Sequence, residues 1–388
     1  MVRATRLVAQ VDHAGRAVSQ KFKSKLHDTR IAALLGVALG VAFTICFTTG
    51  LLSHLIQHPP SWFNYPSRPA GLYRITQGLH IITGFMAVPL LLAKLWVVSP
   101  RLFTWPPVRS VAHLVERISI VPLVAGSLFM LFSGIANVAR WYPYDFYFPS
   151  AHFTVAWITI GALVAHIGAK ITLTRTVLRR EPPTHLLTAS GNDRRKFIGG
   201  VATTSALVAL ATAGSTVGPL SVISALAQRK PGEGPQGLPV NKSAAAARIR
   251  DAALSPDFRL VIDGNVSTPL SLSLADLQGL TQHTAELPIT CVEGWSRSAS
   301  WTGIAVRDLL ALAGAGDNVA VTVESLERGS RYRRSQLTNG QAYDRDALLA
   351  LQLNGDPLHL DHGFPLRLIA PNRPGVLQTK WVTKLIVR

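Results

Sequence analysis

Cysteine and acidic residues are scarce in this sequence, and both shortages narrow its function. The 388 residues include only two cysteines, Cys46 and Cys291, so the chain is not a domain built on a disulfide framework. Asp and Glu number 21 against 39 Lys and Arg, which gives a formal net charge of +18. No stretch interleaves aromatic and basic residues as nucleic-acid-binding surfaces do, so nucleic acid is not an expected partner.

The basic excess lies in the first part of the chain, together with the long apolar runs. Residues 1–228 hold 21 Lys and Arg against 6 Asp and Glu, whereas residues 229–388 hold 18 against 15. Five runs are long enough to cross a bilayer, which takes about 20 apolar residues. They cover residues 31–56, 72–98, 111–138, 151–174 and 198–227. Basic residues beside apolar runs are orientation signals, so this part is predicted to lie in membrane lipid.

The positions of Lys and Arg assign the sides of the membrane. They gather before the first run, between the second and third, and after the fourth, which places the N-terminus in the cytoplasm. Five spans then place the C-terminal region outside. The sequence therefore predicts a multi-pass protein of the cytoplasmic (inner) membrane with an extracytoplasmic C-terminal domain.

The fifth run begins with an export-like signal. Residues 193–198 read Asp-Arg-Arg-Lys-Phe-Ile and precede a mild run rich in Ala, Gly, Ser and Thr. Arg194 and Arg195 thus resemble a twin-arginine (Tat) signal in mid-chain, which predicts the Tat export machinery as a partner. The alternative is ordinary positive-inside charge. Residues 225–227, Ala-Leu-Ala, fit a signal-peptidase site, and whether the chain is cleaved after Ala227 stays open.

Five segments follow from these patterns. They are a basic cytoplasmic N-terminus (1–30), a four-helix membrane domain (31–178), the twin-arginine segment with the fifth transmembrane helix (179–228), a linker (229–256) and a C-terminal domain (257–388). In the last segment, strands are predicted near residues 258–262, 319–324, 366–370 and 381–387, and a helix over 306–313. The predicted fold is an all-α transmembrane bundle followed by a mixed α+β domain.

Histidines within the apolar runs indicate metal ligands, because an ionisable side chain inside a bilayer is costly and usually functional. His152 and His166 are 14 residues apart, which is about four helical turns and ~21 Å along the axis, so both face the same way at different depths. Depth pairs His80 with His152 and His113 with His166, each pair around one haem iron. His54 and His27 compete as alternatives for the outer and inner haem, and the choice between one and two haems stays open. For His27, His54, His58 and His113 the alternative is a histidine that simply lies at the membrane interface.

Four spans with this histidine spacing resemble the di-haem cytochrome b subunits of quinone-linked respiratory enzymes. The resemblance covers about residues 27–178. It implies haem b as a cofactor and quinone or quinol as a partner.

A second resemblance rests on an ordered series of motifs. The series is Cys-Val-Glu-Gly-Trp-Ser (291–296), Trp-Thr-Gly (301–303), Ala-Leu-Gln-Leu-Asn-Gly-Asp-Pro-Leu (350–358), His-Gly-Phe-Pro-Leu-Arg-Leu-Ile (362–369) and Lys-Trp-Val (380–382). It resembles the sulfite oxidase-type molybdopterin domain over residues 257–388. The most similar branch is the periplasmic methionine-sulfoxide reductase catalytic subunit, which also carries a Cys-x-Glu motif.

The resemblance implies roles for individual residues. Cys291 would be a molybdenum ligand, since a soft thiolate suits that metal beside the pterin dithiolene. Glu293 would point the same way on an extended segment and move a proton; its alternative is a solvated surface carboxylate. Four basic residues would hold the pterin phosphate: His362, Arg367, Arg373 and Lys380. Arg297 and Arg333 are weaker candidates for binding an oxyanion substrate.

Together these features predict a membrane-anchored molybdopterin oxidoreductase. Quinol would reduce the haems, the haems would reduce molybdenum, and the substrate would be an S- or N-oxide or another small oxyanion, protein methionine sulfoxide being one example. One alternative is a sulfite-type dehydrogenase that runs in the oxidative direction. Another is a haem-b membrane protein whose outer domain only binds or senses a ligand. The substrate, the direction of electron flow, the quinone site and the oligomeric state stay open.

Overall fold

The computed structural model describes residues 24–102, 110–179, 189–227 and 232–388. The chain forms two compact units. The helical unit holds the chain up to Thr48 and His80–Thr212, and the sheet unit holds Thr49–Leu79 and Ala213–Arg388. The sheet unit therefore includes the ends of two long helices and the loop that joins them.

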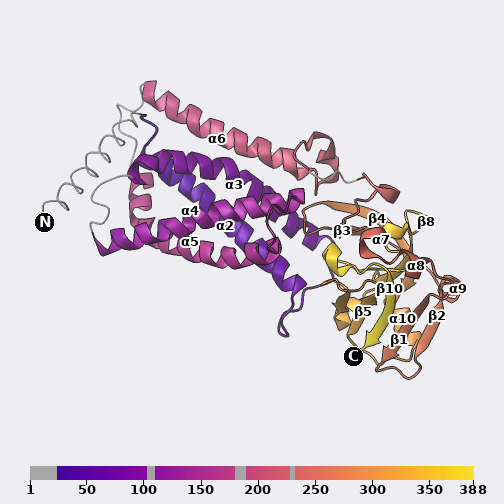
Figure 1. Cartoon of the computed structure of the whole chain (residues 1–388). Coiled ribbons are helices and arrows are strands. Elements are labelled where there is room, and N and C mark those ends of the chain that lie inside the picture. Colours follow the sequence, from indigo (N-terminus) through magenta and orange to yellow (C-terminus); the bar gives the residue numbers. More distant parts are fainter. Residues whose placement is uncertain (1–23, 103–109, 180–188, 228–231) are drawn as a thin grey trace. The chain divides into compact units, whose positions relative to one another are not determined.

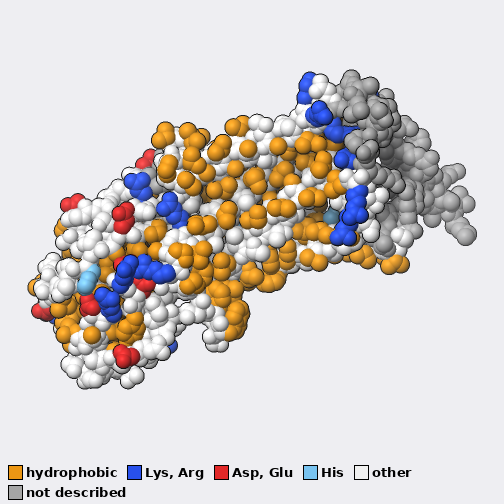
Figure 2. Space-filling view, turned by 180° about the vertical axis from the view of Figure 1, so that it is seen from behind, with side chains coloured by type: hydrophobic (Ala, Val, Ile, Leu, Met, Phe, Trp, Pro, Cys, Tyr) orange, Lys and Arg blue, Asp and Glu red, His pale blue; other side chains and the backbone are white. Residues whose placement is uncertain are grey.

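Five long helices confirm the predicted spans in number and order. They are α2 (Thr29–Gln57), α3 (Leu72–Leu102), α4 (Val111–Ala139), α5 (Phe148–Arg179) and α6 (Ala189–Ala213) (Figure 1). Each contains a stretch long and apolar enough to cross a membrane. Hydrophobic side chains also cover the outward face of the helices in Figure 2, which suits a lipid environment. The structure thus has the helices of a membrane-anchored protein.

The fifth helix is shorter than the apolar run predicts. It ends at Ala213, and the chain turns at Gly214, whose amide donates to Ser224 Oγ. A Cβ at Gly214 would lie 2.3 Å from Leu220 O, so the turn requires glycine. The short helix η2 (Gly218–Ile223) follows, with proline at its start. The apolar run of residues 198–227 therefore continues past the end of α6 at Ala213, and composition alone did not show where the helix ends.

Two five-stranded sheets form the sheet unit. The first has the order β2-β1-β10-β5-β6, and only β1 and β10 run parallel. Its strands are β1 (Arg259–Gly264), β2 (Leu270–Ser273), β5 (Val321–Ser325), β6 (Arg334–Leu337) and β10 (Val382–Val387). The second runs β3-β4-β7-β8, with β9 paired to β7. Its strands are β3 (His283–Thr290), β4 (Ser296–Ala305), β7 (Leu348–Leu353), β8 (Asp356–Pro357) and β9 (Arg367–Ile369).

Short helices connect the strands. They are η3 (Pro235–Gly237), α7 (Ala244–Ala247), α8 (Arg250–Leu254), α9 (Leu274–Gly279), α10 (Val306–Leu312), α11 (Asn339–Ala342), η4 (Leu360–His362) and η5 (Gly375–Leu377). The mixed α+β prediction is confirmed, including the α10 helix and the strands β1, β5, β9 and β10. Strand β3 lies at a sheet edge, where Pro288 costs no ladder bond.

Buried apolar side chains form a core for each sheet. Trp301 of β4 is fully buried, and its indole Nε1 donates to Leu287 O at 3.3 Å. Asn354 and Gly355 join β7 to β8 with positive φ angles of 54° and 90°, as a two-residue type I′ hairpin requires. The hydrophobic core therefore fixes β3 and β4, and these two strands present the loop that carries Cys291.

Residues 235–254 do not form a free linker, which corrects the prediction for residues 229–256. Leu238 is 1% exposed, and Gln236 Nε2 donates to Leu353 O at 3.1 Å. Ala244, Ala247 and Ile249 pack in one buried cluster with Trp381. We call residues 235–254 the strap. The small apolar residues of the strap show no helical or strand periodicity in the sequence, but they pack against Trp381 in the structure.

Candidate active site

Cys291 lies in a tight turn between β3 and β4. The last ladder pair is Thr290 and Ser296, and the Cys291 amide then donates to Trp295 O at 2.8 Å. Gly294 closes the turn with φ of +98°, a conformation that favours glycine. We call residues 291–295 the Cys291 turn. The thiol-bearing residue is 2% exposed, so the fold holds it inside the unit instead of on the surface.

Asn241 of the strap contacts the sulfur directly. Its Nδ2 donates to Cys291 Sγ at 2.7 Å, and its Oδ1 accepts from Trp295 Nε1 at 3.2 Å. A donor aimed at sulfur favours the thiolate, which is the metal-binding form. The sequence gives no signal for Asn241, because it lies in the expected linker and matches no motif.

Glu293 is not on an extended segment, and that expectation is wrong. Residues 292 and 293 are in the turn, where the Gly294 amide donates to Cys291 O at 3.1 Å. The backbone amide of Glu293 lies 3.4 Å from Cys291 Sγ, so Glu293 touches the sulfur through its main chain. Its side chain is partly buried. The glycine at position 294 allows the reversal, which alternation of strand side chains does not foresee.

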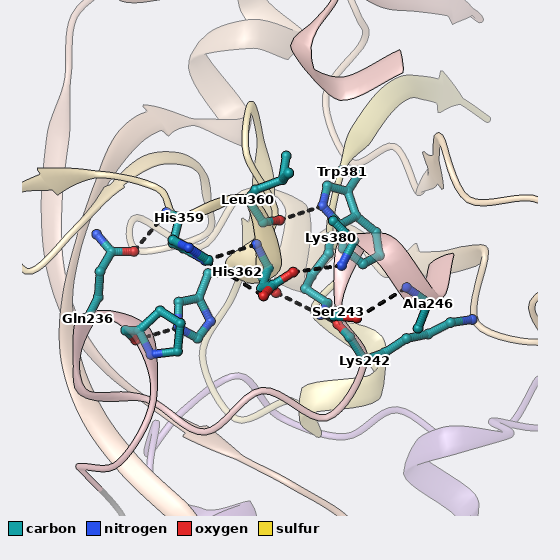
Figure 3. Close-up of polar contacts among 12 residues, drawn as sticks. Gln236, Lys242, Ser243, Ala246, His359, Leu360, His362, Lys380 and Trp381 are labelled. Carbon is teal, nitrogen blue, oxygen red and sulfur yellow. Dashed lines mark hydrogen bonds and ion pairs between the residues drawn. The ribbon is translucent and has the colours of Figure 1, made fainter. Parts of the chain in front are cut away.

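Three of the four predicted phosphate ligands gather in one place. We call His362, Arg367 and Lys380 the basic cluster, and Figure 3 shows His362 and Lys380 with their strap partners. Arg367 and Lys380 form an isolated β-bridge, and Arg367 Nη1 donates to His362 O at 3.0 Å. Gly363, at φ +118°, lets them approach, because a Cβ there would lie 3.1 Å from Arg367 Cβ and 3.2 Å from Lys380 Cβ.

The strap closes over the basic cluster with backbone carbonyls. His362 Nε2 lies 2.6 Å from Pro235 O and donates to it, and Lys380 Nζ donates to Asp361 O at 2.9 Å and to Lys242 O (Figure 3). The guanidinium of Arg367 also lies 5.3 Å from the centre of the Trp301 ring. The hydrogen bonds of the cluster therefore go to neutral carbonyl groups, while the carboxylates of Asp361 and Glu327 act on Lys380 electrostatically.

Burial strongly lowers the pKa values of the basic cluster. Burial lowers the pKa of Arg367 to about 9, and burial followed by the charge of Arg367 lowers the pKa of Lys380 to about 7. Burial and the same neighbour lower the pKa of His362 to about 4, so its imidazole is neutral at pH 7. Asp361 and Glu327 partly oppose the lowering of the Lys380 pKa, but the described contacts of Arg367 include no carboxylate, and a buried cation without a matching anion is costly. Such an arrangement fits a site that receives an anion.

Arg373 lies on a different segment, which runs beside the end of β3. Thr290 and Pro374 form a parallel bridge, and Gly375 would place a Cβ 3.3 Å from Thr290 O. Arg373 is 4% exposed, and its Nη1 donates to Gln341 Oε1 at 2.6 Å. Burial lowers its pKa to about 10. The Nε atoms of Arg367 and Arg373 are both buried without a hydrogen-bond partner, which leaves two donors aimed inside the unit.

The two weaker substrate candidates lie at the surface. Arg297 on β4 is exposed. Arg333 is also exposed and pairs with Glu324 at 3.8 Å. Neither is brought into the Cys291 turn by a contact among the described residues.

In the helical unit, the imidazole rings of His80 on α3 and His152 on α5 are neighbours in an edge arrangement, with an interplanar angle of 72°. Their ring centroids are 6.3 Å apart. His80 Nδ1 donates to Cys46 O at 2.9 Å, and His152 Nδ1 lies 2.8 Å from Ser133 Oγ. An imidazole oriented through Nδ1 presents Nε2 as its metal ligand. The structure thus brings together the pair that the sequence predicts for the outer haem.

Only one side chain of the predicted inner pair, that of His166, is among the described residues, and the alternative ligands His27 and His54 have other neighbours. His166 is partly buried on α5, and the side chain of His113 lies outside the described residues. The His27 ring lies tilted against Trp96, with centroids 4.6 Å apart, and its Nδ1 is 3.1 Å from Val97 O. His54 stacks on His58 at 4.7 Å.

The twin-arginine segment is part of the helical unit. Arg194 and Arg195 lie in α6, and Arg194 Nη2 is 3.6 Å from Asp28 Oδ2. This ion pair ties the start of α6 to the segment just before α2.

Comparison with known proteins supports a cofactor-binding role. A family profile described as "Oxidoreductase molybdopterin binding domain" matches residues 246–388. An uncharacterized oxidoreductase of Bacillus subtilis, YuiH, is 30% identical over 126 residues, which cover 32% of this chain and 62% of that protein. The sulfite oxidase of Arabidopsis thaliana is 28% identical over 166 residues, covering 34% of this chain and 42% of that enzyme.

A solved structure is also similar. The sulfane dehydrogenase SoxCD of Paracoccus pantotrophus shows 27% identity, a TM-score of 0.32, and coverage of 34% of this chain and 39% of that one. The chain spans less than two thirds of the length of each of these relatives. Residues 246–388 are a molybdopterin-binding oxidoreductase domain of the sulfite oxidase type. The predicted domain start at residue 257 lies 11 residues after the start of the match.

Proposed function

We propose that this chain is a membrane-anchored molybdenum oxidoreductase that passes electrons from quinol, through b haems, to an extracytoplasmic molybdenum centre. The observation that carries the proposal is the buried thiol of Cys291, held by Asn241 in a domain of the molybdopterin-binding type. The five apolar helices support membrane anchoring. The twin-arginine sequence at Arg194 and Arg195 supports export of a folded domain by the Tat machinery.

The residues present fit molybdopterin. Cys291 offers one soft ligand, and the Nδ2 of Asn241 stabilises negative charge on its sulfur. The buried Nε donors of Arg367 and Arg373 lack acceptors, which a phosphate or the polar edge of a pterin would supply. Lys380 would add a charge that pairs with phosphate. The finer likeness to periplasmic methionine-sulfoxide reductases rests on the Cys-x-Glu spacing.

When bound, molybdenum would supply oxygen-atom transfer coupled to a two-electron redox change. The chain's own residues do the rest. The Cys291 turn fixes the sulfur, burial excludes water, and the Glu293 carboxylate, two residues on, can move a proton. In the net reaction an S-oxide takes up two protons and two electrons, its sulfur–oxygen bond breaks, and a thioether and water are released. Quinol supplies the two electrons as it is oxidised to quinone and releases two protons.

His80 and His152 fit one haem b. Two neighbouring imidazoles from different helices, each oriented through Nδ1, suit a bis-histidine iron site. His113 and His166 are proposed for a second haem. Quinol is the proposed donor, because the four-span arrangement resembles quinone-linked cytochromes b.

A second candidate is oxidation of a sulfite-like oxyanion with electrons passed to the quinone pool. The similarity to a plant sulfite oxidase favours this direction. The same residues would serve both reactions, so the substrate and the reduction potentials of the centres would decide the direction of electron flow.

Metal and haem quantification on the purified full chain tests the proposal. We expect one molybdenum per chain, b-type haem, and loss of molybdenum in Cys291→Ser with the haem spectrum intact. Cys46→Ser is the matched control and should keep its molybdenum, since Cys46 lies in α2. A chain free of molybdopterin after expression in a host that makes the cofactor would refute the proposal. A substrate screen with reduced quinone analogues then separates oxide reduction from sulfite oxidation.

A further inference from the structure

We propose that Gln77 and Thr216, which lie far outside the matched cofactor domain, are positioning residues that set the conformation of the Cys291 turn. Gln77 belongs to α3 and Thr216 follows α6, and both are part of the sheet unit. This inference rests on the proposed role of Cys291 as a metal ligand. It assigns a chemical task to the ends of two apolar helices.

Two carbonyl groups of the turn accept hydrogen bonds from side chains outside it. Gln77 Nε2 donates to Val292 O at 2.9 Å, and Thr216 Oγ1 donates to Gly294 O at 2.8 Å. Next to them, the Ser296 amide donates to Ser215 O at 2.8 Å. Buried carbonyls need partners, so these contacts decide which way the Val292–Glu293 and Gly294–Trp295 peptide planes face.

Both positioning side chains are themselves fixed. Gln77 and Thr216 are each 4% exposed. Arg74 Nε donates to Thr216 O at 3.0 Å, one turn before Gly78 on the same helix. A Cβ at Gly78 would lie 2.7 Å from Thr216 Cγ2, so glycine is needed for Thr216 to reach the turn.

The loop before α3 is anchored to the cofactor domain at other points. Asn372 Oδ1 accepts from the Tyr73 amide at 2.6 Å, which satisfies a donor in the first turn of α3. Asn372 Nδ2 donates to Pro66 O at 2.6 Å. Arg68 forms ion pairs with Asp344 at 2.8 Å and with Asp346. These contacts hold α3 in register, so that Gln77 can act on the turn.

Thiol chemistry in the cofactor-free full chain provides the first test. The protein is made in a host that lacks molybdopterin, and alkylation of Cys291 by iodoacetamide is followed by peptide mass spectrometry, which separates it from Cys46. Thr216→Val keeps the shape and removes the donor, so we expect Cys291 alkylation to change by about tenfold or more as the turn relaxes. Thr216→Ser restores the hydroxyl and should react as wild type.

The matched control is Thr284→Val. Thr284 is exposed on β3, at the far end of the same hairpin, where its Oγ1 pairs with Thr302 Oγ1 at 2.8 Å. Equal alkylation rates in Thr216→Val and Thr284→Val would overturn the proposal. Should Thr216→Val fail to fold, Gln77→Met tests the other carbonyl with the same criterion.

The loaded protein gives a second readout. Thr216→Val should alter the Mo(V) electron paramagnetic resonance spectrum and lower kcat more than it changes KM, while Thr216→Ser restores both. An unchanged spectrum beside a lower kcat would overturn the positioning role. The two proposals fail separately, because a chain without molybdenum in which Thr216→Val still changes Cys291 alkylation keeps the positioning role and loses the proposed function.

Discussion

Replacing Arg367 should have opposite effects on the cofactor-free and the cofactor-loaded protein. Arg367 is 5% exposed, and its guanidinium donates a hydrogen bond to His362 O and has an Nε without a partner. In the cofactor-free chain, Arg367→Met removes a buried cation whose pKa burial has lowered to about 9. Replacing a buried cation that has no ion-pair partner by an apolar side chain of similar volume should be neutral or stabilising, because the desolvation cost of the charge is removed.

The loaded chain should respond in the other direction. There the guanidinium would pair with phosphate, and a hydrogen bond to a charged group contributes about 1.5–3 kcal/mol. Arg367→Met should therefore weaken molybdopterin binding by roughly ten- to a hundredfold, since about 1.4 kcal/mol is one factor of ten. The result is a variant that is at least as stable as wild type without cofactor and less stable with it.

Denaturant unfolding of both forms measures these effects. The control is Arg250→Met, an exposed arginine on α8 that should change neither form. If Arg367→Met destabilised the cofactor-free chain as much as the loaded one, Arg367 would be an ordinary structural residue, and its assignment to the cofactor would be wrong.

Three further outcomes are expected. Above pH 7 the Kd for molybdopterin should rise by up to about tenfold per pH unit, because Lys380, with its pKa of about 7, must take up a proton to pair with phosphate. In Lys380→Met the Kd should not change between pH 7 and 9, and a wild-type Kd that also stays constant over this range would contradict the assignment of Lys380 to the phosphate. His152→Ala should lower b-type absorbance in the haemochrome assay, and unchanged haem content would reject the His80–His152 site. Arg194→Lys combined with Arg195→Lys should keep the C-terminal domain inside, and digestion of that domain by protease added to intact spheroplasts would argue against Tat export.

Local patterns in the sequence predicted much of the architecture. The five helices were visible because apolar runs of membrane length have few other interpretations. The strands β5 and β9 were visible as short buried runs, and the pairing of His80 with His152 followed from depth along two helices. The motif series placed Cys291 and the basic cluster in one domain. These features depend on residues close together in the chain, or on a known resemblance.

Contacts between distant segments could not be predicted in the same way. Asn241 reaches Cys291 across 50 residues, and nothing in its neighbourhood distinguishes it from a linker residue. The turn at Glu293 depends on one positive φ at Gly294, which overrides the alternation expected of a strand. The end of α6 at Ala213 depends on how Gly214 packs against Leu220. In each case tertiary packing decided between conformations that the local sequence allows.

The separation between Gln77 and Val292 also sets an order of events on the ribosome. The two residues are 215 positions apart, so at roughly 5–20 residues per second α3 is complete some 10–40 s before its partner carbonyl is made. During that interval the amide of Gln77 must be hydrated or paired elsewhere. The peptide planes of the Cys291 turn therefore settle only after most of the polypeptide has been synthesised, and a ribosome that stalls before residue 292 leaves the Gln77 amide without its carbonyl partner.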